Sequence, residues 1–283
     1  MENNQVVASV SPFGPKIDVR PVFEHDRAVL IDLLTDLQPQ EWQRPTACAP
    51  WLVRDVVAHL LGADLSRLAR TRDGHTGNSP VPGEPLPAFI HRFNQDWVSA
   101  ASRVSPAMLI DLFTTTSPHV LRMWRDLDLD VLGEPVSWAG PDPAPRWLDC
   151  ARDFTEYWVH QQQIRDATRR PDTDRPTVVH TVLDTFLRAL PHTLAHRDDA
   201  EGTIVTIEVD GPGGGTWSWR RSGQHWRPSS DGSAAMTTLT TDPDTLWRLC
   251  VRGIEPHQAR PRVAVRGNAE LADAALHIVS IIR

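Results

Sequence analysis

The spacing of apolar residues changes partway along this chain, and that change restricts the fold more than any other feature. Between Val22 and Leu37, apolar side chains recur at steps of three and four residues, the period of an amphipathic helix. Between Ile204 and Val209 the side chains alternate at steps of two, as in a β-strand. At 283 residues the chain is long enough to form two cores. We therefore expect an α+β protein with two domains.

The first part of the chain contains several helical stretches separated by loops rich in proline and glycine. Ser105 followed by Pro106 is typical of a helix start, with the serine as N-cap. The predicted helices cover residues 22–37, 51–70, 87–103, 106–129 and 146–168, and residues 133–145 are predicted to form a loop. Antiparallel packing is the natural way for long amphipathic helices to bury their apolar faces, so we expect a helical bundle.

The last part of the chain is predicted to mix helices and strands. Residues 169–176 are interpreted as a linker because Arg, Asp, Thr and Pro dominate there. We place the domains at residues 1–172 and 173–283. The second domain is expected to contain a helix over 177–196, a hairpin over 204–221, strands at 236–241 and 263–266, and helices capped by Asp242 and Asn268. Its glycine-rich turn lacks the strand-to-helix context of a phosphate loop.

Charge and cysteine content restrict the class of protein. The formal net charge is −7, which argues against nucleic acid as a partner because phosphate binding needs a basic surface. The three cysteines are widely spaced and odd in number, which favours a reducing compartment over a disulfide framework. The sequence shows neither a signal-peptide pattern nor an apolar stretch that could cross a bilayer. We therefore expect a cytoplasmic protein without a membrane partner.

Three side chains that can bind a metal lie in two of the predicted helices. Glu156 and His160 are four residues apart, so an α-helix turns through roughly 400° between them and places both on one face. His59 lies near the middle of an earlier predicted helix. Catalytic zinc sites commonly use three protein ligands and keep one position for water or substrate. Together the three residues predict an open site for a divalent metal, provided that the bundle brings His59 to the other two.

Simpler interpretations exist for these and similar residues. A lone histidine among valines and leucines, as His59 is, often serves as a core residue. His192 and His196 share the four-residue offset, but they follow Pro191 near a predicted helix end, where we interpret them as solvated. Cys48 lies in a loop before the His59 helix, where it could approach the site, although a small buried filler is the preferred interpretation.

Two sequence segments resemble a known protein family. The stretches EWQRPTACAPWLVRDVVAHLLGAD and TEYWVHQQQIRDATRRP resemble the mycothiol-dependent maleylpyruvate isomerase family, a branch of the DinB-like metal-dependent superfamily. This resemblance implies a DinB-like antiparallel four-helix bundle followed by a small sterol-carrier-like α+β domain. It also implies that His59, Glu156 and His160 hold the metal. Many relatives carry an acidic residue where Gln163 stands, a departure that bears on substrate choice.

The expected chemistry follows from the ligand set and from the resemblance. A dication held by two imidazoles and one carboxylate keeps a net charge near +1 and attracts an anionic fourth ligand such as hydroxide or thiolate. The resemblance supplies the thiol, mycothiol, and implies isomerisation of a maleylpyruvate-like substrate or thiol transfer to another small electrophile. We expect zinc, although nickel, cobalt and iron also suit these ligands. The sequence carries no indication of oligomeric state.

Arginine side chains are the expected clamps for an anionic substrate because the planar guanidinium matches a carboxylate. Arg92 and Arg252 are our candidates, with surface arginines as the simpler interpretation. Two other functions stay open. One is a non-catalytic protein that binds an apolar ligand in a pocket lined by Trp217, Trp219 and Trp247. The other is a metal-dependent hydrolase that uses no thiol.

Overall fold

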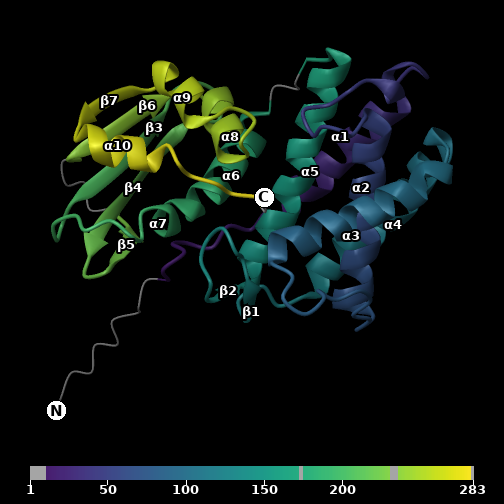
Figure 1. Cartoon of the computed structure of the whole chain (residues 1–283), viewed down its shortest axis with the longest axis horizontal. Helices are drawn as coiled ribbons and strands as arrows, with labels where there is room; N and C mark the ends of the chain where they lie inside the picture. Colours follow the sequence, from purple (N-terminus) through teal and green to yellow (C-terminus); the bar gives the residue numbers. More distant parts are fainter. Residues whose placement is uncertain (1–10, 172–174, 230–234, 282–283) are drawn as a thin grey trace. The chain divides into compact units, whose positions relative to one another are not determined.

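The computed structural model describes residues 11–171, 175–229 and 235–281 and divides into two compact units (Figure 1). The helical unit comprises residues 18–132 and 145–178. The α+β unit comprises residues 133–144 and 179–281, together with the segment 11–17. This confirms the predicted α+β class with helices first and a sheet later. The predicted domain boundary at residues 172 and 173 lies outside the described residues and stays a prediction.

Four helices of the helical unit pack around one core, and a fifth packs against α2. The helices are α1 (Arg20–Thr35), α2 (Val53–Arg67), α3 (Leu86–Ala100), α4 (Pro106–Asp126) and α5 (Arg146–Thr168). Helices α1 and α2 both contact α4 and α5, whereas α3 contacts α2 and buries only Val98 fully. In the part of the chain that the structure describes, no helix is both long and apolar enough to cross a membrane.

The helix ends follow local sequence signals. Ser105 caps α4 by accepting a hydrogen bond from the backbone nitrogen of Met108, and Pro106 occupies the first helical position. Helix α5 begins at Arg146, directly after Pro145, and ends at Thr168, so its predicted range is confirmed. Helix α2 ends at Arg67 and continues as a π-helical turn, Leu68–Arg72, where we had expected regular helix to residue 70.

The α+β unit is built on a five-stranded mixed sheet with the order β5-β4-β3-β6-β7. Strand β3 pairs antiparallel with β4 and parallel with β6. The strands are β3 (Ile204–Val209), β4 (Gly215–Ser222), β5 (His225–Pro228), β6 (Thr237–Thr241) and β7 (Ala264–Gly267). The helices are α6 (Pro176–Phe186), which begins at the end of the helical unit, α7 (Leu190–Thr193), α8 (Pro243–Cys250), α9 (Pro256–Ala259) and α10 (Ala269–Ala275). The predicted hairpin and the caps Asp242 and Asn268 are confirmed.

Four details of the predicted secondary structure were wrong. The segment 133–145 is not all loop, because β1 (Leu132–Pro135) and β2 (Pro143–Pro145) pair there in a two-stranded sheet. Proline is tolerated at such edges, where a missing N–H costs no ladder bond. The helix predicted over 177–196 is interrupted by a 3₁₀ turn and ends at Thr193. Strand β5 and the one-turn helix α9 were not predicted, because four-residue elements carry little periodicity.

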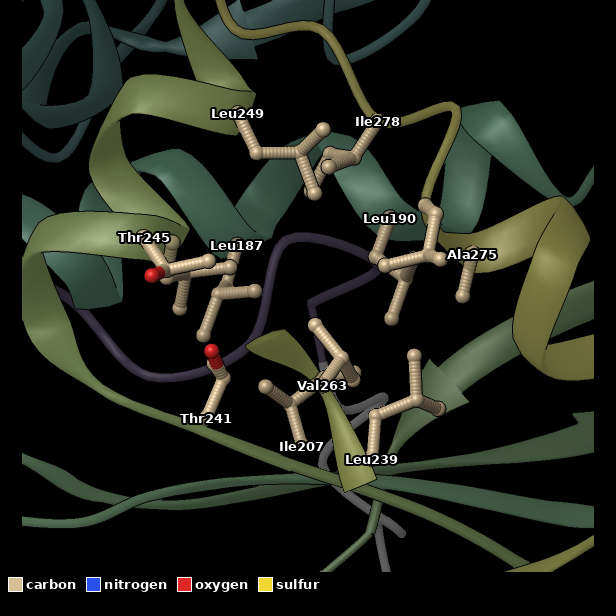
Figure 2. A pocket seen from close by; sticks show the side chains of 12 residues that line it. Leu187, Leu190, Ile207, Leu239, Thr241, Thr245, Leu249, Val263, Ala275 and Ile278 are labelled. Carbon is tan, nitrogen blue, oxygen red and sulfur yellow. The ribbon is translucent and has the colours of Figure 1, made fainter. Parts of the chain in front are cut away.

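A small apolar cavity lies between the sheet and the helices of the α+β unit. In Figure 2 side chains point into it from β3 and β6 on one side and from helical segments on the other. Its lining consists of Leu187, Leu190, Ile207, Leu239, Thr241, Thr245, Leu246, Leu249, Val263, Ala275, Leu276 and Ile278. A water-sized space needs roughly 10 to 15 Å³. The cavity volume is about 20 Å³, so it is a packing defect rather than a ligand site.

The pocket of Trp217, Trp219 and Trp247 that an apolar-ligand binder would use stays a prediction. Trp217 stacks on the ring of His180 and donates a hydrogen bond to Asp184. Trp219 and Trp247 are buried, but neither lines the cavity described above. Trp219 and Trp247 therefore belong to the core of the α+β unit, whereas Trp217 is half-buried.

Candidate metal centre

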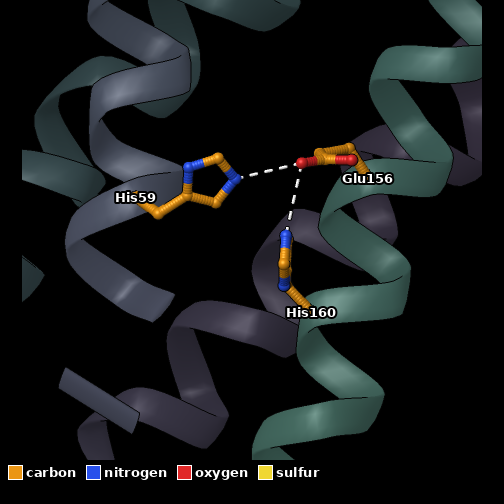
Figure 3. Close-up of side chains that lie close together, drawn as sticks. All are labelled: His59, Glu156 and His160. Atoms are coloured by element: carbon orange, nitrogen blue, oxygen red, sulfur yellow. Dashed lines mark hydrogen bonds and ion pairs between the residues drawn. The ribbon is translucent and has the colours of Figure 1, made fainter. Parts of the chain in front are cut away.

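Helix packing brings the three predicted ligands together (Figure 3). The Nε2 atom of His59 lies 3.0 Å from Oε1 of Glu156, and the Nε2 atom of His160 lies 3.2 Å from the same oxygen. Each residue offers one donor atom, and the three donor atoms lie within 4.8 Å of one another. Two atoms bonded to one zinc ion at about 2.0 to 2.2 Å lie roughly 3.3 to 3.6 Å apart in a tetrahedral site. The two nitrogen–oxygen distances are close to this range, and a spacing as wide as 4.8 Å would have to shorten on binding. The donor types and their convergence therefore fit a divalent cation.

The same two helices that carry the three ligands are joined by buried polar contacts. Tyr157 of α5 donates a hydrogen bond to Asp64 of α2. Arg67, also on α2, forms ion pairs with Asp149 at 2.9 Å and with Asp153 at 3.2 Å on α5. Because each contact joins α2 to α5, these bonds fix how far one helix is displaced along the other. His59 reaches Glu156 and His160 only at that displacement.

The carboxylate of Asp64 is the centre of one of these networks. It accepts a hydrogen bond from Arg27 at 2.6 Å and another from Thr116 at 2.5 Å, in addition to that from Tyr157. The guanidinium of Arg27 also donates to Ser117 at 2.7 Å. Burial alone would lower the pKa of Arg27, but the charge of Asp64 raises it above its usual value, so Arg27 stays cationic.

Glu156 has the most exposed side chain of the three candidate ligands. The side chains of His59 and His160 expose 8% and 10% of their surface, whereas that of Glu156 exposes 40%. A molecule that approaches the ligand atoms therefore meets Glu156 first. This arrangement matches a site that holds its ion from the protein side and keeps a position free toward solvent.

The three ligands have shifted pKa values. Burial lowers the pKa of His59, which favours the neutral imidazole. Burial also opposes ionisation of Glu156, yet hydrogen bonds with both histidines hold the pKa of its carboxyl well below the usual range. For His160 burial is outweighed by hydrogen bonds with Cys48 and Glu156, which raise its pKa to about 10. Binding of a cation at Nε2 of His160 therefore requires that a proton leave.

The loop before α2 supplies two neighbours of the centre. Cys48 lies with its Sγ atom 4.0 Å from Nδ1 of His160 and donates a hydrogen bond to Oε1 of Gln163 at 3.0 Å. The ring of Trp51 lies over that of His59, with centroids 5.0 Å apart, and its Nε1 donates to Gln95. The filler interpretation of Cys48 was wrong, because its half-buried thiol is beside a candidate ligand. No sequence signal pointed to Trp51.

The two candidate arginines have local partners. Arg92 forms two hydrogen bonds with Glu84, at 2.9 and 2.8 Å. Arg252 belongs to the α+β unit, has a left-handed backbone with φ of 55°, and donates to the carbonyl oxygen of His277 at 2.8 Å. Their role in binding substrate stays a prediction. The rival residues His192 and His196 are exposed at the end of α7, as predicted.

Comparisons with known proteins indicate the family and the fold. The model of the mycothiol maleylpyruvate isomerase N-terminal domain matches residues 23–165. Two uncharacterized proteins from Mycobacterium tuberculosis strains CDC 1551 / Oshkosh and H37Rv are each 28% identical over 200 residues, which is 66% of this chain and 70% of theirs.

Crystal structures of the mycothiol-dependent maleylpyruvate isomerase and of a mutant of it are also similar to this chain. Each has a TM-score of 0.51 at 12% identity, covering 81% of this chain and 86% of the other. At that identity the likeness shows a shared fold.

Proposed function

Because the chain belongs to the mycothiol maleylpyruvate isomerase family by its N-terminal domain, we propose that it is a metal-dependent enzyme that uses a low-molecular-weight thiol, mycothiol, as cosubstrate. The observation that carries the proposal is the convergence of His59, Glu156 and His160 on one point. Zinc is the proposed metal because two imidazoles and one carboxylate suit it. The proposed location is the cytoplasm.

The residues of the centre have separate tasks in this proposal. His59 and His160 each contribute a neutral nitrogen, and Glu156 contributes the only negative charge, so a bound dication keeps a net charge near +1. A metal ion at this position lowers the pKa of a bound thiol and thereby supplies a thiolate nucleophile at neutral pH. The buried histidines shield one side from water, while the exposed edge of Glu156 leaves an approach for thiol and substrate.

The proposed substrate is a small electrophile. In an isomerisation of the maleylpyruvate type, the thiolate adds to one carbon of a double bond that is conjugated to a carbonyl group, and the electron pair moves to the carbonyl oxygen. The resulting single bond rotates, and return of the electron pair re-forms the double bond and releases the thiolate. If the enolate takes a proton from solvent instead, the carbon–sulfur bond stays. In a thiol transfer that bond is kept and a thioether is released. Arg92 and Arg252 are the proposed partners for a carboxylate of the substrate.

The alternative of an apolar-ligand binder has little support, because the cavity of the α+β unit has room for about one water molecule. A thiol-independent hydrolase would use the same three ligands. It is separated from the proposal by one control, a reaction without thiol, because only the hydrolase keeps its activity there.

The test is to incubate the zinc-loaded protein with mycothiol and either maleylpyruvate or a panel of electrophiles, and to analyse products by mass spectrometry. An isomer has the mass of the substrate, whereas an adduct gains the mass of the thiol. We expect turnover that needs both zinc and thiol. Loss of an outer-shell partner weakens metal affinity by roughly 10- to 100-fold, and His59→Ala, which removes a ligand, should weaken zinc affinity by more than that. Turnover should be lost with the metal.

The matched control is His119→Ala, which removes an exposed histidine from α4 of the same unit. It should keep zinc content and turnover. If the wild-type protein binds zinc but yields no product with any electrophile in the presence of mycothiol, the proposed function is wrong.

A further inference from the structure

The amide oxygen of Gln163 is placed between two donors beside the metal centre. It lies 2.7 Å from Nδ1 of His160 and accepts the thiol hydrogen bond of Cys48 at 3.0 Å. Gln163 follows His160 by three residues on α5, so both side chains project from one face of the helix. A carbonyl oxygen has two lone pairs and accepts both bonds at once.

The position of this oxygen matters because the two ring nitrogens of a histidine have different tasks. An imidazole that binds a cation through Nε2 must carry its proton on Nδ1. Nε2 of His160 faces Glu156, and Nδ1 faces Gln163, so the ring is already turned for this division. A ligand histidine is usually held by an acceptor at its second nitrogen, which fixes both the tautomer and the ring orientation.

The other histidine of the centre is held in a different way. The ring of His59 lies against Trp51, with an angle of 36° between the ring planes, and its Nε2 faces Glu156. Packing against an aromatic ring restricts the position of His59 without selecting a tautomer. Nε2 of both histidines lies within hydrogen-bond distance of Glu156, and a cation that binds at Nε2 replaces the proton there. The shortest contact left to hold a proton on His160 is then the one between its Nδ1 and Gln163.

We propose that Gln163 is a positioning residue that holds the proton of His160 on Nδ1 and so presents Nε2 to the metal, with Cys48 holding the amide in place. The inference depends on the metal-binding part of the proposed function and not on the thiol chemistry. Because glutamine is neutral, it orients the ring without adding a second negative charge beside that of Glu156. The centre then keeps the net positive charge that attracts an anionic ligand.

The first experiment measures the dissociation constant for zinc by competition with a chromophoric chelator. Gln163→Leu removes the acceptor, and we expect zinc binding to weaken by about 10- to 100-fold. Gln162→Leu is the matched control, because it removes a buried amide from the preceding position of α5, which makes none of the contacts with His160 described above. Gln163→Glu restores an acceptor and should restore the affinity. Equal dissociation constants for Gln163→Leu and Gln162→Leu would overturn the proposal.

A second measurement begins with the wild-type protein, so its main result does not depend on the stability of a variant. In the zinc-loaded wild-type protein, the Nδ1 proton of His160 should exchange slowly with water in ¹H–¹⁵N spectra, whereas the ring protons of the exposed His192 should exchange too fast to observe. Cys48→Ala should speed up exchange at His160 less than Gln163→Leu does. A proton on Nδ1 of His160 that exchanges as fast as those of His192 would contradict the assignment.

The two proposals fail in different ways. If zinc affinity responds to Gln163 as expected but no electrophile reacts, the positioning role stands and the proposed reaction is wrong. If turnover with mycothiol is found but the affinity and exchange do not respond to Gln163, the reaction stands and the positioning role is wrong.

Discussion

The cores of the two units are stabilised by different interactions. In the helical unit, Arg27 and Asp64 expose 1% and 0% of their side chains, and charged groups join α2 to α5. In the α+β unit, leucine, isoleucine and valine surround a small cavity between sheet and helices. Apolar contact is non-directional, whereas hydrogen-bonded charges accept one geometry. Arginines are also buried in the α+β unit, at Arg188 and Arg221, but Arg188 pairs within its own helical segment, with Asp184. The difference indicates that directional contacts between helices position the ligands in the helical unit.

Thiol reactivity offers the largest contrast, between Cys48 at the centre and the two cysteines buried in the cores of the two units. Burial raises the pKa of Cys250, in the α+β unit, from 9.0 to about 12, which lowers its thiolate fraction by about a thousandfold at neutral pH. Burial likewise raises the pKa of Cys150 in the helical unit, whereas Cys48 is half-buried beside the centre. We expect iodoacetamide to label the native protein at Cys48 alone, as read by peptide mass spectrometry.

Two controls accompany this labelling. Cys48→Ser should take up no label when native, and the wild-type protein should label at all three cysteines in denaturant. Labelling of native Cys250 as fast as Cys48 would show that the core of the α+β unit opens readily, and the contrast would be lost.

Removal of one buried charge should strongly lower the stability of the helical unit. Asp64→Ala leaves the guanidinium of Arg27 buried without its carboxylate, so we expect a loss of about 3 to 5 kcal/mol in the free energy of unfolding. Urea unfolding followed by circular dichroism measures it. Asp111→Ala, at an exposed position of α4, is the control and should change little. Replacing both partners, as Arg27→Met with Asp64→Leu, should cost less than Asp64→Ala alone.

Truncation of one apolar side chain should lower the stability of the α+β unit by somewhat less than the charge removal lowers that of the helical unit. It should leave the metal centre intact. Leu239→Ala removes a buried side chain that already borders a cavity, and we expect the free energy of unfolding to fall by about 2 to 5 kcal/mol. The loss should lie in the lower half of this range if neighbouring side chains move in to fill the space. Met236→Ala, which changes an exposed side chain next to β6, is the matched control. Urea unfolding gives the stability, and zinc titration should give wild-type affinity for both variants. A loss of zinc affinity in Leu239→Ala would contradict the division of tasks.

Much of the helical unit was predictable because its signals are local. Ser105 as N-cap and Pro106 at the first helical position indicated where α4 begins, and the four-residue offset of Glu156 and His160 placed them on one face of α5. The third ligand, His59, was found from the sequence through its resemblance to a family, because no local pattern links it to residues nearly a hundred positions later.

The surroundings of the ligands were not predictable for a physical reason. Cys48 and Trp51 reach the two histidines from an irregular loop, and loop geometry carries no periodic signal. Gln163 was noticed only as a departure from an acidic residue, and its hydrogen bond depends on the ring orientation of His160. Strand β5 was missed because only four residues form it.

The polar anchors of α5 recur at every fourth position. Asp149 and Asp153 bind Arg67, Tyr157 binds Asp64, and Gln161 donates to Asp26. One residue inserted or deleted within this stretch would rotate everything beyond it by roughly 100° and uncouple all later anchors from their partners. The register of α5 against its neighbours therefore tolerates substitutions between the anchors but no change in the number of residues that separate them.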